Sequence, residues 1–217
     1  MFSRSCVFVV ALVCSMLAGC AAPHSDLLYK DRPMVSEKEG LIVASLGYRN
    51  SEERLVNNVM QRPAIHLAVQ SKSGGTAQKI QVSTQAHMFA QGAWRDEDYV
   101  RPTDSGRRVL VGYKVPAGNY EVVEQRVELY GGSMTWSARP QRRTPLVFTV
   151  APGQITYIGA HVLQTESGKN WLGMAVPAQA RLDTLDEFDE DMGVLRRVRP
   201  ELRDAVANDA LRVRKPD

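Results

Sequence analysis

Short stretches in which hydrophobic and polar residues alternate dominate the chain between residues 40 and 182. In residues 64–70 the alternation places Ile65, Leu67 and Val69 on one face of an extended strand. Residues 41–48 are almost continuously apolar, a pattern typical of a strand that is buried on both faces. Similar stretches follow, with turn residues between them, at 79–84, 108–115, 120–130, 145–150, 154–162 and 170–182. The pattern predicts a mainly β fold, an antiparallel β-sandwich of about seven or eight strands.

Two turns between these stretches share one design, Pro116-Ala117-Gly118 and Ala151-Pro152-Gly153. Proline presets φ and glycine permits a positive φ, so we expect a tight type II turn at such a sequence. With their flanks, Val115 to Tyr120 and Val150 to Tyr157, the two segments resemble the repeated turn motif of carboxypeptidase-regulatory-like and transthyretin-like sandwich domains. The resemblance covers roughly residues 40 to 182. It implies a sandwich fold and brings no catalytic residue with it.

The C-terminal residues, 183–217, show helical spacing. Leu185, Phe188, Met192 and Leu195 recur every three or four positions and form one apolar stripe. The segment Thr184 to Glu187 fits a capping box, which predicts a helix that begins at Asp183 or Thr184. Pro200 would end this helix and start a shorter one that runs to about Leu211. We therefore expect one or two C-terminal helices, with the apolar stripe packed on the sheet.

The first nineteen residues have the organisation of a secretory signal. Arg4 supplies positive charge, residues 6–16 are almost wholly apolar, and small residues lead to Cys20. The apolar run is shorter than the roughly 20 residues that a membrane span needs. Leu17-Ala18-Gly19-Cys20 resembles the lipobox of bacterial lipoproteins. The resemblance implies cleavage before Cys20 and a lipid anchor on its thiol.

The resemblance also implies a location. Ala21 stands where an aspartate would imply retention at the inner membrane, so we expect the protein on the inner leaflet of the outer membrane, facing the periplasm. Residues 20–39 are mostly polar and contain Pro23 and Pro33. They are interpreted as a lipidated tether that lets the domain stand off the membrane.

The amino-acid composition excludes several kinds of functional site and partner. The chain has three cysteines, of which Cys6 and Cys14 leave with the signal and Cys20 carries the lipid. The mature chain would then have no free thiol, which excludes disulfides, cysteine nucleophiles and cysteine-based metal sites. The net charge of +3 gives no nucleic-acid footprint, and we expect no nucleic-acid partner.

No motif indicates catalysis or a cofactor. The four histidines show no i, i+4 pair, no Gly-x-Ser-x-Gly elbow is present, and Ser167-Gly168-Lys169 lacks the upstream glycine of a phosphate-binding loop. We expect no catalytic residue, no metal site and no cofactor. The alternative is an envelope hydrolase whose site gathers His66 or His161 with nearby acids.

Two polar stretches, residues 91–101 and 131–143, combine aromatic and basic residues and are interpreted as binding loops. Tryptophan and arginine are typical anchors for glycan, peptide or protein ligands. The arginines could also contact anionic lipid headgroups. The other interpretation is that each tryptophan packs into the edge of the sandwich while the arginines stay solvated. The candidate residues are Trp94, Tyr99, Trp136, Arg139, Arg142 and Arg143.

These patterns together favour a membrane-anchored, non-catalytic binding or accessory module of the cell envelope, with an envelope protein or glycan as partner. A purely structural subunit of an envelope assembly is the further alternative.

The lipid anchor leads to a direct test. We expect a Cys20→Ser variant to lose incorporation of a fatty-acid probe and firm membrane attachment, because serine offers no thiol for alkylation. Metabolic labelling and membrane fractionation measure both effects. Continued labelling of the variant would contradict the lipobox assignment.

Overall fold

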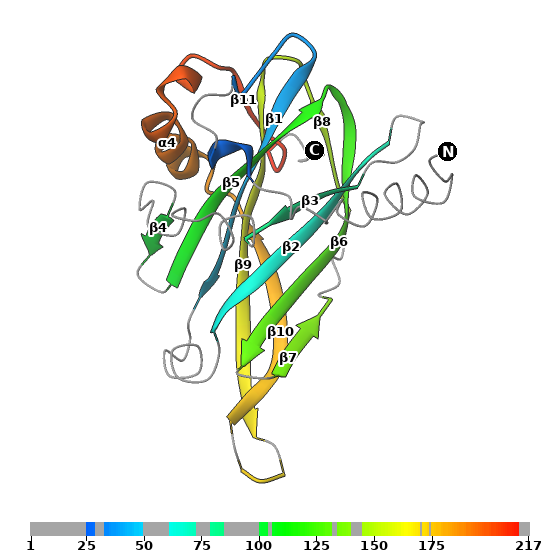
Figure 1. The fold of residues 1–217 in the computed structure, drawn as a ribbon, viewed down its shortest axis with the longest axis vertical. Coiled ribbons are helices and arrows are strands. Elements are labelled where there is room, and N and C mark those ends of the chain that lie inside the picture. The colour runs from blue at the N-terminus through cyan, green and yellow to red at the C-terminus, as the bar shows by residue number, and fades with distance from the viewer. Residues whose placement is uncertain are drawn as a thin grey trace, which may run out of the picture.

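The computed structural model describes residues 25–28, 33–49, 61–72, 79–84, 100–103, 106–131, 134–139, 145–169, 171–173 and 175–212. These residues form two β-sheets and one α-helix (Figure 1). The first sheet has the order β10-β9-β1-β5-β4, with β11 also paired to β9; the second has the order β3-β2-β6-β7, with β8 also paired to β6. The bounds of the first sheet are β1 (Glu39–Arg49), β4 (Val100–Thr103), β5 (Gly106–Pro116), β9 (Ile155–Lys169), β10 (Ala175–Leu185) and β11 (Ala207–Asp209). Those of the second are β2 (Gln61–Ser71), β3 (Lys79–Ser83), β6 (Gly118–Gly131), β7 (Met134–Ala138) and β8 (Leu146–Val150).

The mainly β class that the alternation predicts is confirmed. The second sheet is antiparallel throughout. The first sheet is mixed, because β9 runs parallel to β1 and to β11. Among the described residues, β4, β7 and β11 are strands that the sequence pattern did not predict. β4 and β11 have only four and three residues, which makes their alternation too brief to recognise.

The main core lies between the two sheets. Inward-facing residues of both sheets form one buried cluster, which includes Ile42, Val111 and Ile158 from the first sheet and Leu67 and Phe148 from the second. A hydrogen bond also links the sheets inside this core, from the Ser83 backbone N–H to the Tyr113 hydroxyl at 3.2 Å.

A second apolar cluster covers the outer face of the first sheet. Leu41, Val43 and Tyr157 pack there against Met192 and Leu195 of helix α4 (Phe188–Val198). The predicted apolar stripe therefore packs on the sheet, and β1 is buried on both faces, as its apolar run predicts. The Tyr157 hydroxyl donates a 2.5 Å hydrogen bond to buried Asp191, which keeps this carboxylate paired within the interface.

The segment before β1 docks on the same face, so the prediction of a free tether over residues 20–39 is wrong for residues 25–28 and 33–39. Leu27 and Met34 are fully buried in the second cluster. Leu27 belongs to the 3-10 turn η1 (Asp26–Leu28), and its carbonyl accepts a 3.0 Å hydrogen bond from buried Arg199. The mostly polar composition of residues 20–39 predicted a linker, but Leu27 and Met34 within it pack on the sheet.

Ser25 and Asp26 also complete one edge of β5. Within the described chain, β5 pairs with β4 only at residues 106–109, which leaves the rest of that edge without a neighbouring strand. The Ser25 hydroxyl accepts from the Gly112 N–H at 3.0 Å, and the Asp26 carboxylate accepts from the Lys114 N–H at 2.8 Å. The N-terminal segment thus satisfies edge groups that would otherwise invite pairing with another chain.

The C-terminal helix begins later than its sequence predicts. β10 continues through Leu185, so the boundary placed at residues 182 and 183 does not separate two structural units. Thr184 bonds His161 across β9 and β10, and Glu187 forms an ion pair with buried Arg108 instead of completing a capping box. The helix starts at Phe188. Contacts with the sheet occupy Thr184 and Glu187, so these tertiary contacts override the capping-box sequence.

The second predicted helix is absent from the described residues 199–212. Pro200–Leu202 forms only a 3-10 turn, η4, and the chain then extends as β11. β10 pairs with β9 only from Ala160 onward, so the edge at Ile155–Tyr157 is open to a further strand. β11 occupies that edge in parallel.

The two similar turns differ in conformation. Gly153 has φ of 70°, and the Gln154 N–H reaches the Ala151 carbonyl at 3.3 Å, in agreement with the predicted type II turn. Gly118 is not among the described glycines with positive φ, so the expected type II turn at Pro116 is wrong. Hydrogen bonds hold that corner instead, from the Tyr120 hydroxyl to Pro116 O and from Ala117 N–H to Lys38 O.

The docked segment gives a stability prediction. Leu27→Ala should lower the free energy of unfolding by about 3 kcal/mol, because it opens a cavity under a fully buried side chain. Urea titration measures the change, and Val147→Ala on the exposed face of β8 is the control, with an expected change below about 0.5 kcal/mol. Equal effects of the two substitutions would mean that the N-terminal segment does not dock.

Candidate functional site

A β-bulge in the second sheet creates a polar surface on its outer face. Ala68 pairs with Glu124 and Val69 pairs with Val122, so Val123 is an extra residue on β6. Tyr120 and Val122 face the core before the bulge, and Val127 faces it afterwards. The odd residue shifts the alternation by one position. Glu124, Arg126 and Glu128 consequently point away from the core.

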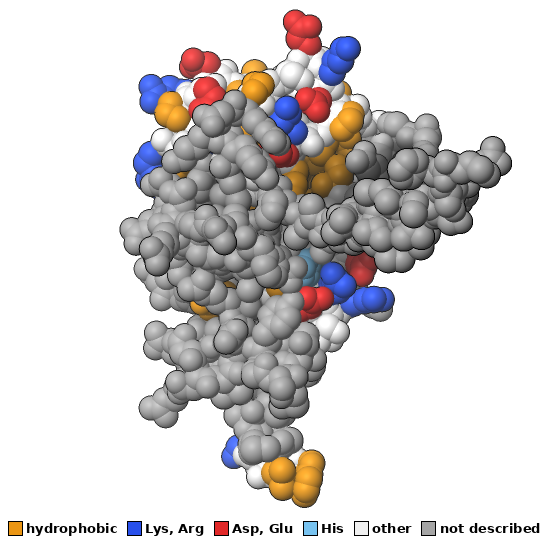
Figure 2. All heavy atoms as spheres, in the orientation of Figure 1, with side chains coloured by type: hydrophobic (Ala, Val, Ile, Leu, Met, Phe, Trp, Pro, Cys, Tyr) orange, Lys and Arg blue, Asp and Glu red, His pale blue; other side chains and the backbone are white. Residues whose placement is uncertain are grey.

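His66 lies beside these charged residues. Its neighbours Ile65 and Leu67 enter the core, so the imidazole lies on the outer face of β2, opposite Arg126 on β6 and Ser83 on β3. Although it is on the outer face, His66 is only 3% exposed. Figure 2 shows acidic and basic side chains gathered around a histidine near the middle of this face of the molecule.

Hydrogen bonds hold the imidazole at Nδ1, and Nε2 faces a carboxylate. The Gln81 side-chain amide lies 2.7 Å from Nδ1, the Ser83 hydroxyl lies 2.8 Å from the same atom, and Glu128 lies 3.5 Å from Nε2. An amide nitrogen only donates, so Nδ1 accepts and the ring proton sits on Nε2, toward the Glu128 carboxylate. Burial lowers the pKa of His66 below its usual 6.5; Glu128 opposes this shift, and the Arg126 guanidinium adds to it. His66 is therefore neutral at pH 7.

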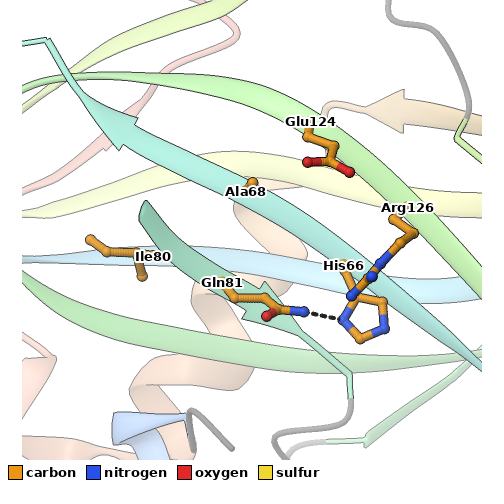
Figure 3. Close-up of a pocket in the computed structure, with 6 residues that line it drawn as sticks. All are labelled: His66, Ala68, Ile80, Gln81, Glu124 and Arg126. Atoms are coloured by element: carbon orange, nitrogen blue, oxygen red, sulfur yellow. Dashed lines mark hydrogen bonds between the residues drawn. The ribbon is translucent and has the colours of Figure 1, made fainter. Parts of the chain in front are cut away.

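A hollow of about 210 Å³ opens beside this histidine (Figure 3). In Figure 3, Gln81 points from β3 toward the imidazole, and Arg126 reaches across it from β6. Glu124 contributes a carboxylate, and Ala68 and Ile80 contribute a small apolar patch. Ion pairs organise the charges, with Arg126 at 3.5 Å from Glu128 and Arg139 at 3.5 Å from Glu124.

Ser83, His66 and Glu128 contact one another in series, and their residue types match the nucleophile, base and acid of a catalytic triad. Two features argue against a poised nucleophile. Ser83 is only 2% exposed, and Gln81 competes with its hydroxyl for the Nδ1 lone pair. The geometry is better suited to fixing the position of His66 beneath a ligand.

The other histidine considered for catalysis, His161, has a structural role. It is fully buried and bonds the Ile158 carbonyl and the Thr184 hydroxyl, each at 3.2 Å. No group of three or more histidine, cysteine, aspartate or glutamate residues that could hold a metal ion occurs within the part of the chain that the structure describes.

A second hollow, of about 350 Å³, lies between β8 and β11 and is more apolar, with Val147 and Phe148 in its wall. Its polar residues bond within the chain. Asn208 donates to Gln154 at 2.6 Å, and Asp209 accepts from the Leu211 N–H at 2.8 Å. The other Asp209 oxygen forms an ion pair with Arg212 at 3.1 Å. Because these polar groups are engaged within the chain and the wall is mostly apolar, the His66 hollow is the stronger candidate site.

The structure brings one predicted binding residue to the His66 hollow. Arg139, 77% exposed, reaches Glu124 at its rim. The backbone of Trp136 lies in strand β7 and not in a loop, because Met134–Ala138 pairs with β6, and its side chain is outside the described part. Cys20, Trp94, Tyr99, Arg142 and Arg143 also lie outside the described residues.

Sequence reasoning missed most of this site. The alternation in residues 64–70 puts His66 on the face opposite Ile65 and Leu67, and the structure has it there. The charged residues of β6 were not assigned to a surface, because the bulge at Val123 leaves no recognisable mark in the sequence. The pattern Glu124-x-Arg126-x-Glu128 was the available signal, since charges at every second position indicate a solvated strand face.

No protein-family model and no curated protein sequence matches the chain. Among solved structures, part of the chain is similar to a leucine-rich repeat protein from Bacteroides thetaiotaomicron, with 16% sequence identity and a TM-score of 0.30. The match covers 59% of this chain and 14% of that chain. A similarity of this size carries no argument about fold or function.

Within the described residues, no helix has the length and apolar character needed to cross a membrane.

The lowered pKa of His66 predicts a pH-dependent stability. The unfolded chain takes up a proton at a pH near 6.5 and the folded chain does so only at lower pH, so His66 should reduce stability as the pH falls below about 6.5. His66→Gln removes this titration and keeps a hydrogen-bonding side chain. The stability difference between the two proteins, measured by urea titration from pH 8 to pH 5, should shift in favour of the variant on acidification. If the unfolding free energies of the two proteins changed in parallel with pH, His66 would have the same pKa in the folded and the unfolded chain.

Proposed function

We propose that this protein is a lipid-anchored, non-catalytic binding module of the cell envelope and that the His66 hollow binds a glycan. The anchor in this proposal is Cys20, and the location is the inner leaflet of the outer membrane, facing the periplasm. The resemblance of residues 40–182 to carboxypeptidase-regulatory-like sandwiches supports a non-enzymatic role.

The composition of the hollow carries the proposal. Sugar hydroxyls both donate and accept hydrogen bonds, and the hollow presents a donor, Arg126, beside an acceptor, Glu124. Its charges are nearly balanced, which favours a neutral polar ligand over an anion or a cation. Ala68 and Ile80 supply an apolar surface of the kind on which the C–H face of a sugar ring packs. A volume of about 210 Å³ accommodates one sugar residue of a longer chain.

The test uses the Cys20→Ser protein, purified from the soluble fraction and titrated calorimetrically with soluble cell-wall glycan fragments. We expect Glu124→Ala and Arg126→Ala each to weaken binding by about tenfold, equivalent to ~1.4 kcal/mol, because each leaves sugar hydroxyls without a partner. Arg181→Ala is the matched control, since this exposed arginine of β10 also pairs with a carboxylate and lies on the other sheet.

The outcomes separate the alternatives. Unchanged binding in the Glu124 and Arg126 variants would exclude the hollow as the glycan site. Cleaved fragments in the titrated sample, lost in Ser83→Ala, would instead favour the envelope hydrolase, for which the Ser83–His66 contact is the supporting observation. No glycan binding together with a single stoichiometric cross-linked protein in cells would favour an accessory or structural subunit.

A further inference from the structure

One hairpin extends beyond the rest of the first sheet. β1 pairs with β9 only as far as Gln164, whereas β9 continues to Lys169. Over Thr165–Lys169 the described partner of β9 is β10 alone. Five residues of strand project about 16 Å. The β9–β10 hairpin forms the end of the molecule opposite helix α4 (Figure 1).

The tip of this hairpin is apolar and exposed. Trp171 is 90% exposed and Leu172 is 57% exposed, and Gly173 closes the turn with φ of 77°. Lys169 is exposed beside them. Figure 2 shows hydrophobic and basic side chains together at this lower end. Tryptophan is enriched at membrane–water interfaces, and lysine is attracted to anionic headgroups.

We infer that the hairpin tip is a second membrane contact, in which Trp171 and Leu172 enter the interface of the bilayer that holds the lipid on Cys20. This inference rests on the proposed lipid anchor. It assigns the tip a role separate from that of the His66 hollow.

The area of the tip favours a bilayer over a protein partner. One large aromatic side chain buries at most about 250 Å², and a leucine adds less. A stable protein interface needs about 800 Å² from each partner. A bilayer requires no such area, because the anchor already keeps the tip at a high effective concentration near the membrane.

The register of the first sheet shows how the lipid anchor on Cys20 and the hairpin tip can reach the same membrane. Ser25 bonds Gly112 of β5, and Gly112 pairs with Val43 of β1. Val43 in turn pairs with Tyr157 of β9, so Ser25 lies level with Tyr157 along the sheet. From Tyr157 to Lys169 the strand rises by about 40 Å. The five residues from Cys20 to Ser25 reach at most about 18 Å. Anchor and tip therefore touch one bilayer when the long axis of the domain lies along the membrane surface.

The experiment uses the absence of other cysteines in the mature chain. Leu172→Cys is labelled with an environment-sensitive fluorophore in the lipidated protein, reconstituted in vesicles of phosphatidylethanolamine and phosphatidylglycerol. We expect a blue-shifted emission and quenching by spin-labelled lipid. Val123→Cys, which is exposed on the second sheet, is the matched control and should show neither effect. Adding Trp171→Ala to the Leu172→Cys protein should reduce the quenching at least by half.

A second arrangement separates failure of the tip from failure of the anchor. The Cys20→Ser chain from residue 20 is held on nickel-chelating lipid by an N-terminal histidine tag, so attachment no longer depends on lipidation. One outcome would uphold the tip contact and overturn the proposed anchor. It is quenching at residue 172 on this support, together with no fatty-acid labelling of the unsubstituted chain at Cys20 in cells. Quenching no greater than at residue 123 on both supports would overturn the inference, as would a photo-cross-linker at residue 172 that captures one protein while the fluorophore remains unquenched.

Discussion

The first sheet is apolar on both faces, and the rest of the structure follows from the need to cover each of them. The second sheet covers the inner face, where Ile42 and Val111 pack. Helix α4 and the segment around Leu27 and Met34 cover the outer face. Burial of this kind is the main favourable term in folding, so the described segments before β1 and after β10 belong to the domain. The cover also protects the free edge of β5, through Ser25 and Asp26.

Because the outer face of the first sheet is covered around Leu41, Val43 and Tyr157, the polar site lies on the outer face of the second sheet. The bulge at Val123 sets that site, because it turns three charged residues of β6 outward beside His66. Burial of the imidazole is tolerated because Gln81, Ser83 and Glu128 surround it. A small irregularity in one strand thereby converts an ordinary sheet surface into a polar hollow.

Most long strands could be predicted from the sequence, because their alternation is determined by the same burial that holds the sheets together. Ile65, Leu67 and Val69 face the core as predicted, and the run from Leu41 to Leu46 is buried on both sides. The predictions failed where a long-range partner outweighs a local signal. Glu187 pairs with Arg108 instead of capping a helix, and β11 forms because β9 offers an open edge.

The candidate site was less predictable than the fold, since the residues that form it are distant in sequence. His66, Gln81 and Arg126 meet only through strand pairing, and the bulge that orients Arg126 is a feature of the β2–β6 register. The binding residues that the sequence suggested were chosen for their chemistry alone. Of these, Arg139 is the one whose described side chain reaches the hollow.

The hydrogen bond from Arg199 to the Leu27 carbonyl joins residues 172 positions apart and has a kinetic consequence. Long-range contacts of this kind form late and slow the folding of a chain. The N-terminal segment has its full set of contacts only after Arg199, more than nine-tenths of the way along the chain, has emerged. A chain that crosses a membrane before it folds, as the proposed signal peptide requires, benefits from this delay, because its N-terminal segment cannot complete its docking until Arg199 has passed.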